Sequence, residues 1–274
     1  MTNSRPIGIF DSGFGGLTVF KEIAQAFPEY DYMYLGDNAR APYGNRSFET
    51  VYEYTLECVK WLYNQGCPLV ILACNTASAK ALRSIQQNDL KDFDPEFRVL
   101  GVIRPTAEVV ADYTQTKHIG ILGTQGTVSS GSYVLEIAKL APEVRVFQHA
   151  CPLWVPFIEN NEFQDDGIDY YIQKDIQQLL NQSPDIDTIL LACTHYPILI
   201  NKIKQYLPEH IQVVAQGTLV AKSLGSYLQK HTEIQSQITR NAHRCFYTTD
   251  DAKAFETSAS IFLGRDINAT RVHL

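Results

Sequence analysis

The sequence lacks any apolar run long enough to cross a membrane. A membrane-spanning helix needs about 20 consecutive apolar residues, and no run in this chain of 274 residues approaches that length. The N-terminal segment MTNSRPIGIF has one Arg and no long apolar stretch, and Asp11 interrupts its first apolar run. This is not the pattern of a secretory signal. We therefore expect no membrane association and a cytoplasmic location.

Basic runs are also missing. The chain has 23 Lys and Arg against 30 Asp and Glu, a net charge of -7, and its basic residues are scattered. Proteins that bind nucleic acids usually carry a basic patch or stripe. We therefore expect no nucleic-acid partner. A hydrophobic fraction of 45% with 19% charged residues fits a globular protein with a substantial core.

Paired cysteine motifs and nucleotide-binding loops are absent too. No two cysteines are spaced as C-x-x-C, which argues against a zinc ribbon or a thioredoxin-type redox site. The glycine-rich stretch Asp11–Gly16 matches neither G-x-G-x-x-G nor a P-loop. We expect no metal, no cofactor and free thiols in a reducing compartment. The six cysteines are residues 58, 67, 74, 151, 193 and 245.

Short apolar runs alternate with longer helical patterns along the chain. The clearest helix is predicted for Phe48–Asn64, where apolar residues recur on one face and Gly66 follows as a stop signal. Alternating strands and helices predict an α/β fold with largely parallel sheets. The predicted strands are Pro6–Phe10, Tyr32–Leu35, Leu69–Leu72, Val99–Val102, Ile119–Leu122, Val144–Phe147, Thr188–Leu191 and Gln212–Val214.

The chain also repeats itself in part. The run IGIFDS at 7–12 resembles IGILGT at 119–124, and VILACNT at 70–76 resembles ILLACTH at 189–195, in the same order. Apolar strands look alike, but the shared Leu-Ala-Cys ending followed by polar residues is harder to attribute to chance. We interpret the repeat as two related α/β domains. The predicted boundaries are 1–98 plus 211–274 for the first domain and 99–210 for the second.

Two cysteines stand where ligands usually bind in such folds. Cys74 and Cys193 each follow an apolar run, at the carboxyl end of a predicted strand. A helix N-terminus after the strand lowers the pKa of a thiol and favours an anion. A single such Cys is more often a buried, inert side chain, but two in matched contexts favour a functional role. We interpret Cys58 as a core residue and Cys67, Cys151 and Cys245 as structural.

Two polar turns follow strands in the two repeats, and each has two interpretations. Asp11–Gly16 allows either close approach of a ligand to the backbone or a tight turn with Ser12 as a helix cap. Gly123–Thr127 carries hydroxyls that could bind a carboxylate or cap a helix. Taken alone, the second turn is better explained by capping.

Six blocks together resemble the glutamate racemases. They cover nearly the whole chain and come in the family's order, so the joint pattern is far more specific than any one block. One departure concerns Val214–Thr218, where relatives usually carry an Asp-Ser-Gly-like turn, and it puts local contacts or movement between the domains in doubt. The blocks are IGIFDSGFGGLTV at 7–19, DNARAPYG at 37–44, LACNTAS at 72–78, CPLWVPFIE at 151–159, LACTHYP at 191–197 and FLGRDINATRVHL at 262–274.

The resemblance implies two facing α/β domains, related by a pseudo-twofold axis, with the active site between them. It implies that Cys74 and Cys193 are an acid/base pair, with Cys193 on the L face of the substrate and Cys74 on the D face. Asp11 would support Cys74, His195 would support Cys193, and Glu159 would be a further acidic residue of the site. The implied substrate contacts are Asp11, Ser12, Tyr43, Gly44, Asn75, Thr76, Thr124, Thr127, Thr194 and His195.

The implied reaction is cofactor-independent interconversion of L- and D-glutamate, which would supply D-glutamate for peptidoglycan. Two opposed thiols suit this reaction because one removes the Cα proton and the other returns a proton on the opposite face. The implied partner is the small-molecule substrate glutamate. A homodimer is compatible with the sequence, which does not determine the oligomeric state.

Three alternatives stay open at this point. The first is a racemase for aspartate or a related amino acid, although the His after the second Cys-Thr and the DNARAPYG block resemble the glutamate branch more. The second is a Cys–His amidase, which would need one nucleophilic Cys and leave the other unexplained. The third is a glutamate-binding module without catalysis.

Overall fold

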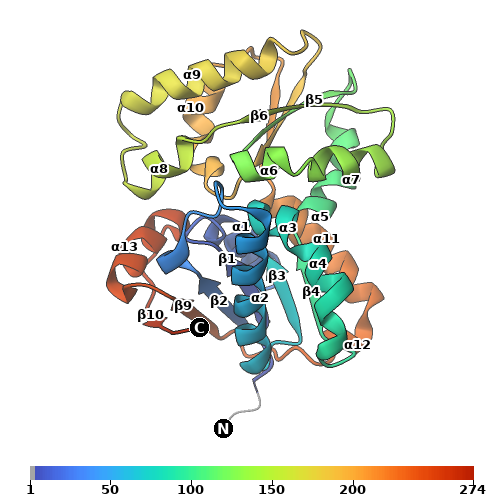
Figure 1. The fold of residues 1–274 in the computed structure, drawn as a ribbon, viewed down its shortest axis with the longest axis vertical. Coiled ribbons are helices and arrows are strands. Elements are labelled where there is room, and N and C mark those ends of the chain that lie inside the picture. The colour runs from blue at the N-terminus through green and yellow to red at the C-terminus, as the bar shows by residue number, and fades with distance from the viewer. Residues whose placement is uncertain (1–3) are drawn as a thin grey trace.

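The computed structural model describes residues 4–274 and contains two parallel β-sheets, one above the other in Figure 1. The larger sheet has the strand order β10-β9-β2-β1-β3-β4, and the smaller sheet has the order β6-β5-β7-β8. All neighbouring strands pair in parallel. In the central strand β1, Ile7 lies opposite Tyr32 of β2 on one side and Leu69 of β3 on the other. The predicted α/β class with parallel sheets is confirmed.

The strands of the larger sheet are β1 (Ile7–Asp11), β2 (Tyr32–Gly36), β3 (Leu69–Leu72), β4 (Arg98–Gly101), β9 (Arg244–Thr248) and β10 (Ala269–Arg271). Those of the smaller sheet are β5 (His118–Gly123), β6 (Arg145–Ala150), β7 (Thr188–Ala192) and β8 (Gln212–Val214). The eight predicted strands correspond to β1–β8. Neither β9 nor β10 was predicted, because β9 contains polar residues and β10 is a short, largely exposed edge strand.

The sequence repeat corresponds to a repeat of topology. The order β2-β1-β3-β4 in the larger sheet matches β6-β5-β7-β8 in the smaller one, so the two IGI runs form equivalent strands and the two Leu-Ala-Cys runs do too. Val99 therefore lies in the last strand of the first repeat, and Gln212 in the last strand of the second. The predicted domain boundaries at 98/99 and 210/211 differ from this sheet membership. The chain changes sheets after Gly101 and again after Val214, and the division into two domains at those points stays a prediction.

Helices cover both faces of the larger sheet. Ile7 and Ile9 of β1 pack in a core with α1 (Leu17–Ala26), α11 (Gly217–Lys230) and α13 (Ala252–Leu263). Phe10 packs on the other face in a core with α2 (Phe48–Asn64). Because both faces are covered, every residue of β1 is buried, as is usual for a parallel strand at the centre of a sheet.

Helix α2 confirms the predicted helix in its bounds and its buried face. Ser47 caps its N-terminus by accepting a hydrogen bond from the Thr50 N–H at 3.1 Å. After the helix, Gly66 adopts a positive φ of 91°, which glycine adopts without strain. Cys58 is fully buried, as expected. The buried residues are Val51, Thr55, Cys58, Val59 and Leu62.

Shorter helices fill the junction between the sheets and surround the smaller one (Figure 1). The chain first passes between the sheets through α5 (Ile103–Ala107) and returns through α11. None of the helices described between residues 4 and 274 combines the length and apolar character needed to span a membrane. The remaining helices are α3 (Asn75–Lys80), α4 (Leu82–Ser84), α6 (Gln125–Ser129), α7 (Ser132–Leu140), α8 (Trp154–Glu159), α9 (Gly167–Leu180), α10 (Ile200–Gln205) and α12 (Thr232–Gln235).

Candidate active site

A cavity lies where the carboxyl ends of the central strands of the two sheets meet. Its walls enclose about 550 Å³, including the open mouth, and they come from both repeats. Cys74 lies two residues after β3 and Cys193 lies directly after β7, so the two thiols come from equivalent strands. The lining residues are Ser12, Pro42, Tyr43, Gly44, Asn45, Cys74, Asn75, Thr76, Thr124, Gln125, Cys151, Pro152, Val155, Glu159, Cys193, Thr194 and His195.

The Cys74 thiol caps helix α3. Its Sγ accepts a hydrogen bond from the Ala77 N–H at 3.4 Å and lies 3.4 Å from the Ser12 hydroxyl. Only 6% of the residue is exposed. Burial, with the nearby Asp11 carboxylate, raises the pKa of Cys74 to about 12, although the contacts with Ser12 and Ala77 act in the opposite direction. Cys74 is therefore held as a neutral thiol at neutral pH.

The Cys193 thiol belongs to a chain of three side chains. Its Sγ lies 3.9 Å from His195 Nδ1, and His195 Nε2 lies 3.1 Å from Glu159 Oε1. Burial disfavours the imidazolium, but Cys193 and Glu159 outweigh that effect and raise the pKa of His195 to about 10. His195 therefore carries its proton at neutral pH. Its ring contacts these two partners and makes no helix-capping hydrogen bond.

Asp11 precedes the lining residue Ser12 but does not itself line the cavity. The residue is fully buried, and its Oδ2 accepts a hydrogen bond from the Gly13 N–H at 2.9 Å. Its Oδ1 has no hydrogen-bond partner among the described residues. Desolvation raises the pKa of this carboxyl, while the positive charge of His195 partly offsets the shift. Asp11 therefore does not face the cavity, and its negative charge contributes to the raised pKa of Cys74.

The glycine-rich turn after β1 packs against the Cys193 side of the site. A Cβ on Gly15 would lie 2.3 Å from His195 Nδ1 and 2.4 Å from Thr194 Oγ1, distances that atoms cannot adopt. Glycine is therefore required at this position for the close approach of the two repeats. Ser12 does not cap helix α1, since the capping position is Gly16. The interpretation of Ser12 as a helix cap is therefore wrong, and the approach of a ligand to this turn stays a prediction.

Three threonines form a connected row between the repeats. Thr76 Oγ1 lies 2.9 Å from Thr124 Oγ1, which lies 3.1 Å from Thr127 Oγ1. Thr124 also caps helix α6 by accepting from the Thr127 N–H. Thr76 and Thr124 line the cavity, whereas Thr127 is fully buried behind Thr124 and does not. The capping interpretation of this turn is confirmed, and Thr127 reaches the cavity only through Thr124.

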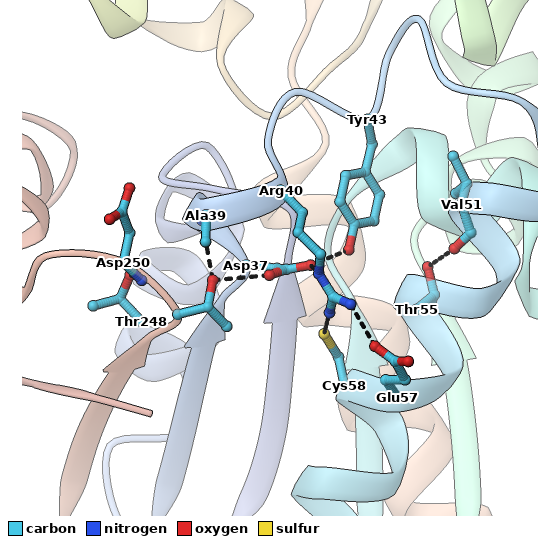
Figure 2. A network of polar contacts seen from close by, with 11 residues as sticks. Asp37, Ala39, Arg40, Tyr43, Val51, Thr55, Glu57, Cys58, Thr248 and Asp250 are labelled. Atoms are coloured by element: carbon cyan, nitrogen blue, oxygen red, sulfur yellow. Dashed lines mark hydrogen bonds and ion pairs between the residues drawn. The ribbon is translucent and has the colours of Figure 1, made fainter. Parts of the chain in front are cut away.

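The loop that follows β2 is anchored by Asp37 (Figure 2). This buried carboxylate accepts hydrogen bonds from Arg40 Nε at 2.7 Å and from the Tyr43 hydroxyl. Arg40 also forms an ion pair with Glu57 of α2. Tyr43 lines the cavity, but its hydroxyl points to Asp37. The same loop places Gly44, whose carbonyl accepts a hydrogen bond from the Gly126 N–H of the other repeat at 2.7 Å.

The model of the Asp/Glu/hydantoin racemase family matches residues 7–224, most of the chain. The chain belongs to this family. A relative from Persephonella marina, named glutamate racemase, is 38% identical over 98% of this chain and 97% of its own. A crystal structure of glutamate racemase isoform RacE1 from Bacillus anthracis has a TM-score of 0.89, with 33% identity and 98% of each chain covered.

A further similar structure was solved with a bound ligand. It is the glutamate racemase from Francisella tularensis in complex with D-glutamate, with a TM-score of 0.86 and 29% identity over 99% of this chain and 98% of that one. The predicted resemblance to glutamate racemases is therefore confirmed over the full length of the chain.

Of the predicted site residues, all but Asp11 and Thr127 line the cavity. Sequence reasoning missed other lining residues, notably Cys151, which was interpreted as structural. Its thiol also lies near His149 and Asp175, and the three ligand atoms are within 4.8 Å of one another. This group could hold a metal ion, although His149 Nε2 already lies 3.0 Å from Asp175 Oδ1. The Cys-Pro block at 151–152 was the available signal, but a lone Cys before Pro does not reveal which cavity it faces.

Proposed function

We propose that this protein interconverts L- and D-glutamate without a cofactor, using Cys193 and Cys74 as the two acid/base groups. The observation that carries the proposal is that two thiols, from equivalent strands of two repeats, line a single cavity. Glutamate is the substrate because relatives that match nearly all of the chain bear the name glutamate racemase and one of them binds D-glutamate.

Each step of the proposed reaction moves one proton between a thiol and Cα. Starting from L-glutamate, the Cys193 thiolate beside the His195 imidazolium takes the Cα proton and becomes a thiol. The electron pair of the broken C–H bond delocalises into the α-carboxylate. Cys74, held as a neutral thiol, gives its proton to the opposite face of Cα and becomes a thiolate. The reverse sequence converts D-glutamate to L-glutamate, so both directions use the same groups.

The surrounding residues have distinct proposed roles. Glu159 holds the imidazolium of His195, and Asp11 opposes loss of the Cys74 proton by its negative charge. Donors along the wall stabilise the charge that builds on the α-carboxylate. They are the side chains of Ser12, Asn75, Thr76, Thr124 and Thr194, with Tyr43 and Gly44 closing the wall and Thr127 fixing Thr124.

The amidase alternative explains less of the geometry. A Cys–His amidase would use the pair Cys193 and His195 and would leave a second thiol, Cys74, unused in the same cavity. The binding-module alternative leaves both thiols unused. We therefore favour racemisation.

The deciding experiment incubates the purified protein with L-glutamate and, separately, with D-glutamate, and follows optical rotation. Both should reach the racemic mixture, and kcat/KM must be equal in the two directions because the enantiomers have equal free energy in water. Ammonia release from glutamine would support the amidase instead. Inversion of aspartate at a higher kcat/KM than glutamate would support the aspartate branch. Binding of glutamate without inversion would support the alternative of a non-catalytic glutamate-binding module.

The proposed cellular role is supply of D-glutamate for peptidoglycan, which places the protein in the cytoplasm. This location and a homodimeric state stay predictions. Sedimentation of the purified protein would determine the oligomeric state.

A further inference from the structure

Gln216 stands at the point where the chain returns from the smaller sheet to the larger one. It lies between β8 and helix α11, in the segment Val214–Thr218. Only 3% of the residue is exposed. Its side chain lies among α3, α5 and α7, which meet at the junction of the two repeats in Figure 1.

The side chains of Asn75, Gln216 and Tyr133 form a closed ring of hydrogen bonds. Asn75 Nδ2 donates to Gln216 Oε1 at 2.6 Å, and Gln216 Nε2 donates to the Tyr133 hydroxyl. The Tyr133 hydroxyl in turn donates to Asn75 Oδ1 at 2.6 Å. Gln216 Nε2 also donates to Thr106 Oγ1 at 2.9 Å. Because the Thr106 hydroxyl itself donates to the Val102 carbonyl at 2.9 Å, it can only accept from Gln216, and this fixes the orientation of the Gln216 amide. Each member gives one hydrogen bond to the next, so the ring has a single sense.

The ring determines which end of the Asn75 amide is a donor. An asparagine amide can rotate by half a turn and exchange its oxygen and nitrogen. Here Oδ1 is held by Tyr133, and Nδ2 uses one of its two protons on Gln216. The other proton of Nδ2 is not used by these contacts, and Asn75 lines the cavity next to Cys74. A carboxylate in the cavity needs donors, whereas a rotated amide would offer it an acceptor.

We propose that Gln216 is a positioning residue that, together with Tyr133, holds Asn75 as a hydrogen-bond donor toward the carboxylate of the substrate. The proposal rests on the proposed function, because it takes the occupant of the cavity to be glutamate. The alternative explanation is that the ring only joins the two repeats and acts on stability alone.

The test substitutes Gln216 with Met, which has a similar length but no hydrogen-bonding amide, and Tyr133 with Phe. We expect each variant to lower kcat/KM for glutamate by roughly ten- to hundredfold, the effect of losing a buried hydrogen bond to a polar group. KM should rise in both directions, because the Asn75 donor is then no longer fixed. Tyr133→Phe removes only the hydroxyl and keeps the aromatic side chain in place. It therefore tests the proposal if Gln216→Met does not fold. The exposed Gln205→Met is the matched control and should retain wild-type values.

A double variant separates positioning from stability. If Gln216 acts through Asn75, adding Gln216→Met to Asn75→Ala should leave kcat/KM as it is in Asn75→Ala alone. Additive losses in kcat/KM, or a lower Tm with unchanged kcat/KM in Gln216→Met and Tyr133→Phe, would overturn the proposal. Wild-type protein that fails to racemise glutamate would overturn the proposed function instead, so the two failures are distinguishable.

Discussion

At the scale of single residues, the two thiols have unlike surroundings although they occupy equivalent positions. Cys74 is flanked by a hydroxyl and a buried carboxylate, and Cys193 by an imidazole that Glu159 holds. The Cys74 side therefore favours a neutral thiol, and the Cys193 side holds a protonated imidazole. In the proposed reaction, this difference lets an acid and a base face the same substrate.

Deuterium incorporation should reveal which thiol serves which face. In heavy water, early D-glutamate made from L-glutamate should carry deuterium at Cα, because the delivering thiol has exchanged with solvent. Cys74→Ser should abolish inversion, since a serine hydroxyl is too weak an acid or base near neutral pH. In Cys74→Ser, the remaining Cys193 should still exchange the Cα hydrogen of L-glutamate slowly without inversion. In Cys193→Ser, the remaining Cys74 should exchange the Cα hydrogen of D-glutamate slowly without inversion. NMR of the recovered enantiomers measures both outcomes, and normal racemisation by both variants would contradict the assignment.

The pH dependence of stability should report the charge on His195. Its pKa is about 10 in the folded protein against 6.5 when unperturbed, so its stabilising contribution is complete below about pH 6.5 and is lost as pH rises toward 10. The difference in unfolding free energy between wild type and His195→Asn should therefore shrink over that range. Urea unfolding at several pH values measures it. A difference that stays constant would indicate a neutral imidazole.

Activity of His195→Asn should fall by roughly 10²–10⁴-fold.

At the scale of secondary-structure elements, the loop after β2 holds its tyrosine by the hydroxyl. Since the Tyr43 hydroxyl donates to the buried Asp37, Tyr43→Phe should reduce unfolding free energy by about 1–3 kcal/mol. Its kcat/KM should stay within a few-fold of wild type, because the ring that lines the cavity is retained. Chemical denaturation and steady-state kinetics check the two parts, with the exposed Tyr170→Phe as control. A large loss of kcat/KM at unchanged stability would mean that the hydroxyl contacts the substrate.

Strands and the main helix could be predicted because their signals are local. The buried face of α2 follows from the helical spacing of its apolar residues, and β1–β8 follow from short apolar runs. Both signals are contained in a few neighbouring residues of the sequence. In contrast, β9 pairs with β2 across some 200 residues of chain, and its own sequence contains Arg244 and Tyr247. Its identity as a strand depends on that partner, which no local pattern encodes.

The same distinction applies to the site. Cys74 and Cys193 could be predicted because each follows its own strand in a recognisable context. Packing between distant segments decides that Asp11 and Thr127 do not line the cavity. The same holds for the hydrogen bonds of Gln216, which join segments far apart in the sequence. The predicted domain boundaries differ from the sheet membership for a related reason, since Val99 lies in β4, which pairs with β3, and does not open a new sheet.

At the scale of the whole molecule, contact between the repeats should be sensitive to a single methyl group. Gly15→Ala would place a Cβ against the buried ring of His195, so the ring or the turn must move. We expect a loss of kcat/KM approaching that of His195→Asn and a decrease of about 1–3 kcal/mol in unfolding free energy from overpacking. Gly167→Ala, whose Cβ would meet only Phe157 at 3.7 Å, is the matched control. Wild-type kinetics in Gly15→Ala would show that the two repeats can separate without harm.

The repeated strand order has an evolutionary consequence. Two units of the same topology, each with a cysteine after the same strand, are the arrangement that duplication and fusion of one gene produce. A predecessor assembled from two identical copies would have given both thiols the same neighbours, and mutations on one side would have been copied to the other. Fusion removes that constraint. Asp11 and Ser12 could then be selected beside one thiol while His195 and Glu159 were selected beside the other, so that under the proposed function each half would adapt to one mirror image of the same molecule.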